Sequence, residues 1–184
     1  MTTVLMVSGS WPPAACSVGN YTELLCQHLE STGIDIARYQ SAKFSRLWSS
    51  AILSEIAVSA CDLIHIQYPT AGYGNSFVPG AIARRIRTKP IVVTLHAYAS
   101  FQPYRKPWFS PFAHYCATRV FTAAFDRSLF AARFPKRGGF DATIDAPGAR
   151  FRWDWITARH VELYGRLRGL SDEMPSARAV LRNA

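Results

Sequence analysis

The chain has few cysteines, few charged residues and none of the short motifs that mark common nucleotide sites. Its four cysteines form no CxxC pair and have no histidine at metal-ligand spacing, which predicts reduced thiols and no metal site. Neither GxGxxG nor GxxxxGKS/T occurs, which argues against dinucleotide-dependent oxidoreductases and P-loop nucleotide hydrolases. No apolar run approaches the ~20 residues that cross a bilayer. Residues 1–8 lack a charged leader, so a cytoplasmic protein is predicted.

The basic residues are concentrated in the C-terminal half of the chain. Residues 1–83 carry 3 basic and 5 acidic groups, whereas residues 84–184 carry 18 basic and 7 acidic groups. Such a field favours anionic partners, namely phospholipid headgroups, phosphorylated substrates or nucleic acid. Nucleic acid is the least favoured of these, because the basic residues are scattered and no recognition motif accompanies them.

Two basic groups are candidates for docking on an anionic membrane surface. The second group stands beside aromatic residues, which prefer the membrane interface. A solvated helix end and an ordinary loop explain the same residues equally well. The candidate residues are Arg84, Arg85, Arg87 and Lys89 in the first group, and Arg105 and Lys106 in the second.

Apolar strand-like runs alternate with segments of helical period. Continuous apolar runs such as 91–95 (IVVTL) are typical of strands buried on both faces. The alternation predicts the α/β class, with a Rossmann-like, doubly wound parallel sheet. Strands are predicted at 3–8, 34–39, 62–67, 91–95 and 119–123, and helices at 20–32, 48–57, 77–87 and 112–117.

The C-terminal part breaks this alternation. Residues 135–148 have neither period and are rich in glycine and proline, so a linker is predicted there. The domain is therefore expected to span residues 1–134. An extra helix over 149–170 is expected to pack on it, and 171–184 to form a flexible tail.

Ligands of parallel sheets bind outside the carboxyl ends of the strands, which selects a few residues. His96 directly follows the 91–95 strand and is the strongest catalytic candidate. Gly19, with its neighbours Val18 and Asn20, stands where a backbone can approach a phosphate or sugar, although a glycine there is more often a packing requirement.

A turn-rich loop after the third predicted strand adds candidate sugar contacts. Its residues Tyr68, Tyr73 and Asn75 combine aromatic faces with a polar amide, but a surface turn would look similar. His65 lies inside a strand and His160 on the apolar face of a helix, so both are expected to be packing residues.

Four segments, in this order and spacing, resemble the N-terminal domain of family 4 (group 1) retaining glycosyltransferases of the GT-B architecture. They are VLMVSGSWPP, SVGNYTELLCQHLESTGIDI, DLIHIQYPTAGYGNS and KPIVVTLHAY, and the likeness spans about residues 3–134. The resemblance implies an acceptor-side domain facing a donor domain. It also implies that Gly19 faces the donor's phosphates and that His96 is the active-site histidine. No metal and no tightly bound cofactor are implied, and a UDP- or GDP-sugar is the expected donor substrate.

The sequence departs from that family in three ways. Cys16 and Ser17 replace a usual glycine pair, and Ala97 replaces a frequently acidic residue. No segment resembles the donor-binding domain. Residues 149–167 (ARFRWDWITARHVELYGRL) instead resemble the last helix of these enzymes, which returns to pack on the first domain.

The expected function is therefore that of the acceptor-binding half of a glycosyltransferase-like protein. Its acceptor would be lipid-linked or a polysaccharide, and its partner a donor-domain chain or a second copy. An alternative is a non-catalytic partner or membrane-docking module of a split glycosyltransferase, or an inactive remnant. Either would be cytoplasmic, with peripheral binding to the inner face of the membrane as a further expectation.

Overall fold

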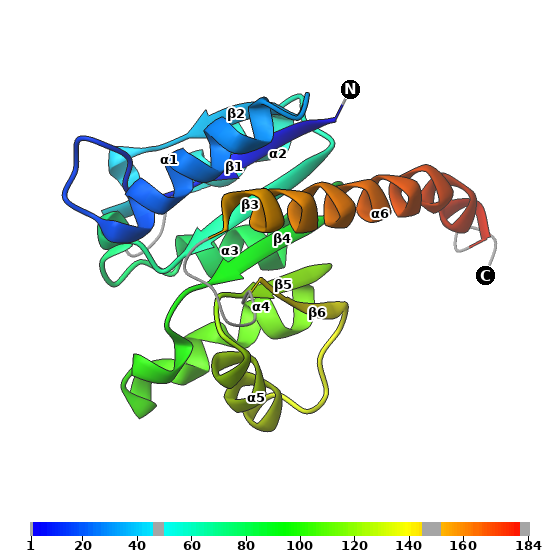
Figure 1. Ribbon diagram of the computed structural model, residues 1–184. Coiled ribbons are helices and arrows are strands. Elements are labelled where there is room, and N and C mark those ends of the chain that lie inside the picture. Colours follow the sequence, from blue (N-terminus) through cyan, green and yellow to red (C-terminus); the bar gives the residue numbers. More distant parts are fainter. Residues whose placement is uncertain (1, 46–49, 145–151, 181–184) are drawn as a thin grey trace.

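The protein, seen in a computed structural model, is built around one sheet of six parallel strands (Figure 1). The structure describes residues 2–45, 50–144 and 152–180, with the backbone alone for 43, 45 and 170–180. The strand order is β2-β1-β3-β4-β5-β6, so the predicted Rossmann-like, doubly wound α/β fold is confirmed. The strands are β1 (Thr3–Val7), β2 (Asp35–Tyr39), β3 (Leu63–Tyr68), β4 (Ile91–Leu95), β5 (Thr118–Phe121) and β6 (Phe140–Thr143).

Helices cover both faces of the sheet. The side chains of α1 and α6 pack on one face, and those of α2, α3, α4 and α5 pack on the other. The α-helices are α1 (Ser17–Glu30), α2 (Ser50–Val58), α3 (Val78–Arg85), α4 (Ser110–Tyr115), α5 (Ala124–Arg133) and α6 (Trp153–Val180). Short 3-10 segments are η1 (Ala42–Ser45), η2 (Ala71–Tyr73), η3 (Tyr98–Ser100) and η4 (Pro103–Phe109).

The central strands are buried on both faces, as their apolar sequences predict. All residues of β3 and β4 are buried, and their side chains alternate between the two faces. Ile64, Ile66 and Tyr68 enter the core beneath α3 and α4. His65 and Gln67 therefore point to the opposite face, beneath α1 and α6. The alternation of side chains between the two faces therefore decides which candidate residues can lie close together.

The extra C-terminal helix packs on the sheet as expected. In α6, Ile156, His160, Leu163, Tyr164 and Leu167 are all buried, which confirms the predicted stripe. The helix continues to Val180, so the backbone of residues 171–180, which were predicted to form a tail, is helical.

The first helix begins earlier than predicted. α1 starts at Ser17, and its N-cap is Cys16 rather than Asn20. The Cys16 sulfur accepts a hydrogen bond from the Gly19 amide at 3.4 Å. A thiol cap is a weaker signal than the asparagine that suggested the later start.

The predicted linker contains the sixth strand. Residues 135–148 were expected to have no regular structure, but β6 pairs with β5 in parallel. Arg119 of β5 lies opposite Asp141 of β6, and the Arg119 Nε lies 2.5 Å from the Asp141 Oδ1. Both side chains are almost fully buried. A buried ion pair, rather than an apolar pattern, holds this edge strand in the sheet.

Candidate functional site

The loops after β1 and β3 meet at the carboxyl edge of the sheet, where the strand order changes direction. The Gly9 amide donates to the Thr70 Oγ1 at 3.0 Å, and the Gly72 amide donates to the Ser10 Oγ at 2.7 Å. A Cβ at Gly72 would lie 1.7 Å from the Gly9 carbonyl oxygen. These loops therefore pack backbone to backbone and fill the position where ligands of such folds commonly bind.

Gly19 also has a packing role. A Cβ at this position would lie 2.8 Å from the Ser10 carbonyl oxygen, so only glycine fits without a shift. Its amide, which the family resemblance assigns to the donor's phosphates, already donates to the Cys16 sulfur. Val18 is half-buried and Asn20 is exposed. Phosphate or sugar binding by these three residues stays a prediction.

His96 stands directly after β4, at the carboxyl edge and on the α1 and α6 face. Its Nε2 lies 2.9 Å from the Gln67 Oε1, and its ring packs edge-on against Tyr21 at 5.2 Å between centroids. Its backbone amide donates to the Tyr68 carbonyl. Burial, with His160 nearby, lowers the pKa of His96 to about 4, so the imidazole is neutral at pH 7.

A buried polar chain runs from His96 to the last helix. The Gln67 Nε2 lies 3.3 Å from the His65 Nε2, which also lies 2.7 Å from the Thr94 Oγ1. On the other side of the same ring, the His65 Nδ1 lies 2.5 Å from the Tyr164 hydroxyl. Burial holds the pKa of His65 well below its usual value. The prediction that His65 is a satisfied core histidine is confirmed.

With the Gln67 amide oriented as the structure places it, these hydrogen bonds set the proton positions on both rings. The Gln67 amide oxygen only accepts, so the His96 Nε2 carries the proton and its Nδ1 keeps a lone pair. The Gln67 NH₂ only donates, so the His65 Nε2 is unprotonated and its Nδ1 donates to Tyr164. Gln67 therefore orients His96 and leaves Nδ1 as its basic atom.

Replacing Gln67 with glutamate is expected to raise the pKa of His96 by about one unit or more. A carboxylate in place of the amide at 2.9 Å would stabilise the charged imidazolium. A pH titration of the His96 ring nitrogens by long-range ¹H–¹⁵N NMR measures this change. Gln67→Met, which removes the acceptor without adding charge, is the matched control and should leave no such increase. An unchanged titration in a folded Gln67→Glu protein would contradict the contact.

A row of aromatic side chains connects His96 to the first turn of α6. Trp153, in the first turn of α6, lies 5.3 Å from the Tyr21 ring and stacks on His28 at 5.1 Å. Tyr21 in turn packs against His96. The carboxyl edge on this face is thus partly covered by the protein's own last helix, although the family resemblance implies that this domain faces a donor domain.

The predicted sugar-binding tyrosines do not join His96. Tyr68 and Tyr73 belong to the core on the opposite face and are 5% and 1% exposed. The Tyr73 hydroxyl donates to the Val7 carbonyl at 3.2 Å, so it is a structural group. Asn75 is exposed. The structure therefore separates Tyr68 and Tyr73 from His96 by the thickness of the sheet.

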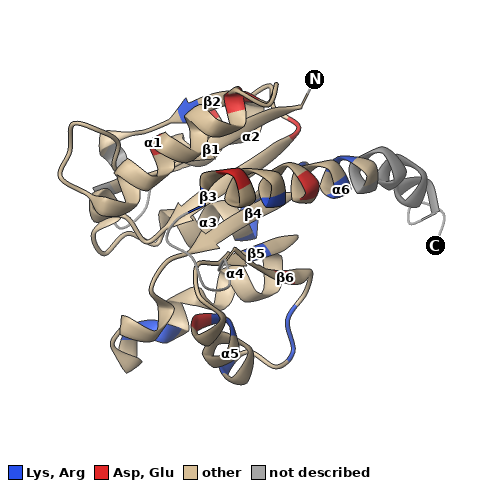
Figure 2. Cartoon of the chain, viewed as in Figure 1, with Lys and Arg blue, Asp and Glu red and all other residues tan. Residues whose placement is uncertain are grey.

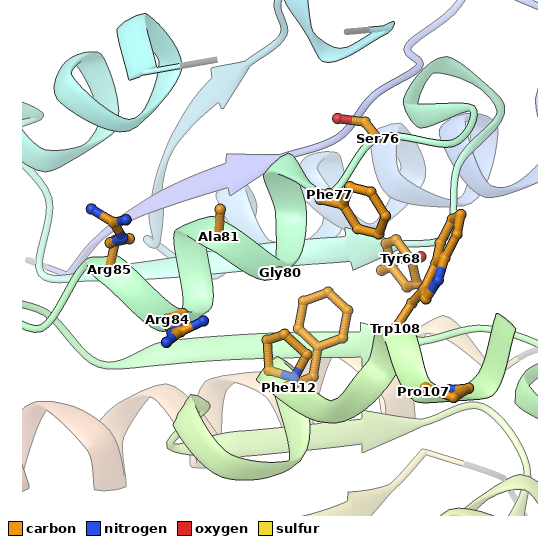
Figure 3. Close-up of a pocket in the computed structure, with 11 residues that line it drawn as sticks. Tyr68, Ser76, Phe77, Gly80, Ala81, Arg84, Arg85, Pro107, Trp108 and Phe112 are labelled. Carbon is orange, nitrogen blue, oxygen red and sulfur yellow. The ribbon is translucent and has the colours of Figure 1, made fainter. Parts of the chain in front are cut away.

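A cavity of about 400 Å³ lies on that opposite face, between α3 and the η4–α4 segment (Figure 3). Its walls are mostly aromatic and apolar, and no acidic residue lines it. At one end, the Phe77 and Trp108 rings approach to 4.8 Å. At the other end, Arg84 and Arg85 line the cavity. Sequence reasoning chose the arginines but missed the aromatic wall, which only the packing of α3 on α4 creates.

The six basic candidates do not form one patch, and Figure 2 shows basic residues spread over several elements. The Lys89 ammonium donates to the Ala57 carbonyl at 3.3 Å, at the end of α2. The Arg87 guanidinium lies over the Tyr115 ring at 4.2 Å. Arg105 and Lys106 lie over aromatic rings too. Arg84 and Arg85 alone among the six line the cavity.

In the part of the chain that the structure describes, no three histidine, cysteine or acidic side chains come together to hold a metal ion. None of the described helices is both long enough and apolar enough to cross a membrane.

Comparisons with known proteins do not identify a family. No protein-family model matches the sequence, and no curated protein matches it. A solved structure of a flavone reductase is similar over 99% of this chain, with 12% identity and a TM-score of 0.32. The match covers 65% of that chain, so this chain spans less than two thirds of its length. A likeness at this level carries no argument about function.

Proposed function

We propose that the chain is the acceptor-side domain of a family 4 GT-B glycosyltransferase. Such a protein moves a sugar from a nucleotide-sugar to a lipid-linked or polysaccharide acceptor. The observation that supports this is His96, a neutral imidazole at the carboxyl edge whose Nε2 is held by Gln67. Its Nδ1 is left to accept a hydrogen bond from an acceptor hydroxyl. This position matches that of the active-site histidine in the family that the sequence resembles.

The packing of α6 supports the same proposal. In the resembling enzymes the last helix returns to the first domain. Here α6 joins the core formed with α1, β1 and β5, and its Tyr164 ends the hydrogen-bonded chain to His96. We infer that α6 helps to hold the histidine in its tautomer.

The proposal assigns only the acceptor to this chain. The Gly19 amide is occupied by Cys16, and the loops after β1 and β3 pack on each other. Binding of the donor UDP- or GDP-sugar is therefore assigned to a separate domain or partner chain. Titration calorimetry with UDP-glucose and GDP-mannose at millimolar concentration should show no binding heat. Submillimolar binding of either sugar nucleotide would overturn this assignment.

A carbohydrate array tests the acceptor role directly. The purified chain should bind a subset of immobilised oligosaccharides and glycolipids, and His96→Ala should weaken this binding by about tenfold. Arg127→Gln is the control, because Arg127 is an exposed residue of α5 that makes no contact with His96 among those the structure shows. Absence of binding to every glycan, with a folded chain by circular dichroism, would reject the acceptor role.

The second candidate is a non-catalytic partner module of a split glycosyltransferase, docked at the inner face of the membrane. The occupied Gly19 amide favours it, because that group offers no hydrogen bond to donor phosphates. Glycan binding that survives His96→Ala unchanged would favour this candidate over the first.

A further inference from the structure

The cavity between α3 and η4–α4 has the composition of a site for an amphiphile. Its aromatic end is formed by Phe77 and Trp108, and its floor by Tyr68 and Phe112, whose rings lie 4.9 Å apart (Figure 3). At about 400 Å³, it falls in the range of small-molecule sites. At Gly80, α3 lies close to α4, because a Cβ added there would lie 3.1 Å from the Pro111 side chain, so the cavity is narrow at this point. A slender apolar ligand suits this shape better than a bulky one.

Two polar groups in the cavity lack partners inside the protein. The Tyr68 ring is buried, but its hydroxyl is not among the buried unpaired polar atoms, and it makes no hydrogen bond to any residue that the structure describes. Arg84 is exposed, and it forms neither a hydrogen bond nor an ion pair within the described residues. Because this hydroxyl is accessible from the cavity and has no protein partner, it can form a hydrogen bond with a polar atom of a ligand. Arg84 adds a positive charge that no carboxylate of the cavity offsets.

We propose that this cavity binds the hydrocarbon chain of an anionic amphiphile, with the phosphate or carboxylate head group held at Arg84. Apolar walls favour a chain, and the absence of lining carboxylates together with Arg84 favours a negative head. Phe77 and Arg84 are seven residues apart along α3, which corresponds to about 10 Å. That spacing accommodates a chain at the aromatic end with its head at the arginine.

The site is separate from the one assigned to sugar transfer. Its residues pack in the core under α3 and α4, whereas His96 and Gln67 lie on the α1 and α6 face. The amphiphile site does not depend on the proposed function. Failure of one proposal therefore leaves the other standing.

Short alkyl phosphates below their micellar concentration provide the test. In titration calorimetry, affinity should rise from ethyl to hexyl to decyl phosphate, by up to about fourfold per methylene until the cavity is filled. Arg84→Gln should weaken decyl phosphate binding by about tenfold. The matched control Arg127→Gln removes an equal charge from α5, outside the cavity, and should change affinity by less than about twofold.

Two variants test the apolar wall and the Tyr68 hydroxyl. Trp108→Ala should weaken decyl phosphate binding while leaving ethyl phosphate unaffected, because only the longer chain reaches the aromatic end. Tyr68→Phe should weaken binding less than Arg84→Gln does. Circular dichroism confirms that each variant is folded, and the chain-length series on the unmodified protein needs no variant at all.

Vesicles distinguish the two sources of such an amphiphile. Flotation with phosphatidylglycerol vesicles, but not with phosphatidylcholine vesicles, and its loss in Arg84→Gln would assign the site to a membrane lipid. Decyl phosphate binding without flotation would assign it to a free amphiphile. No binding of decyl phosphate at millimolar concentration, or equal binding by the Arg84 and Arg127 variants, would overturn the proposal.

Discussion

Replacing Asp141 with alanine is expected to lower the free energy of unfolding by about 3–5 kcal/mol. The Arg119 side chain is fully buried, and its Nε lies 2.5 Å from the Asp141 Oδ1. Its Nη1 also donates to the Ala113 carbonyl at 3.2 Å. Without the carboxylate, the guanidinium would keep its charge in the interior with only carbonyl partners. Urea unfolding followed by circular dichroism measures the loss.

Two matched variants separate the buried pair from its exposed neighbour. Arg137 also contacts Asp141, at 2.8 Å, but it is partly exposed, so Arg137→Ala should cost about 1 kcal/mol or less. In an Arg119→Met background, Asp141→Ala should cost much less than in the unmodified protein, because no buried charge remains to be orphaned. A loss below about 1 kcal/mol for Asp141→Ala alone would show that the pair is not desolvated as the structure has it.

Acidification from pH 7 to pH 4 is expected to lower the free energy of unfolding by about 3 kcal/mol through His160 alone. This side chain is 1% exposed, and its Nδ1 donates to the Ile156 carbonyl at 2.8 Å. The Nε2 is buried without a partner in the described part of the chain. Burial lowers the pKa of His160 to about 4, against about 6.5 in the unfolded chain.

The sign follows from which state binds the proton. Above pH 6.5 both states hold a neutral imidazole, and His160 contributes no pH dependence. Between pH 6.5 and 4 the unfolded chain takes up a proton that the folded protein excludes, so stability falls with pH. Below about pH 4 both states are protonated, and the loss stays constant.

His160→Gln isolates this contribution from that of the carboxylates. Between pH 7 and pH 4 the unmodified protein should lose about 3 kcal/mol more unfolding free energy than the variant does, because the variant has no buried imidazole at this position. A ring titration by NMR with a midpoint near pH 4 gives the same information directly. A difference that stays flat over this pH range would contradict the burial of an uncharged His160.

The hydrogen-bonded chain under α6 shows a signal that was present in the sequence and missed. His65 and Gln67 are two residues apart in β3, and Thr94 in β4 is two residues before His96, which directly follows that strand. In otherwise apolar strands, this spacing places four polar groups on one face. The pattern thus predicts a polar cluster around His96. Its last member, Tyr164, is distant in sequence, and only the packing of α6 brings it there.

Strand parity also explains why the candidate sugar site is divided. Tyr68 follows Gln67, so their side chains leave β3 on opposite faces. His96 shares the face of Gln67, whereas Tyr68 faces the aromatic cavity. Gln67 and Tyr68 are neighbours in sequence, but the Gln67 side chain lies beside His96 and the Tyr68 side chain lines the aromatic cavity.

The sequence by itself determined the succession of the first five strands with α1 to α4 and α6, the two-faced burial of β4, and the stripe of α6, because these depend on local apolar periodicity. It did not predict α5 (Ala124–Arg133). It did not determine β6, whose four residues have no such period. The charged Arg119 lies inside the otherwise apolar β5, where a buried charge requires an oppositely charged partner. Only the folded structure shows that Asp141 is that partner. The cavity beside Arg84 likewise depends on how closely Gly80 approaches Pro111. Both contacts join residues that the sequence alone does not bring together. They depend on how the strands and helices pack, so only the tertiary structure decided them.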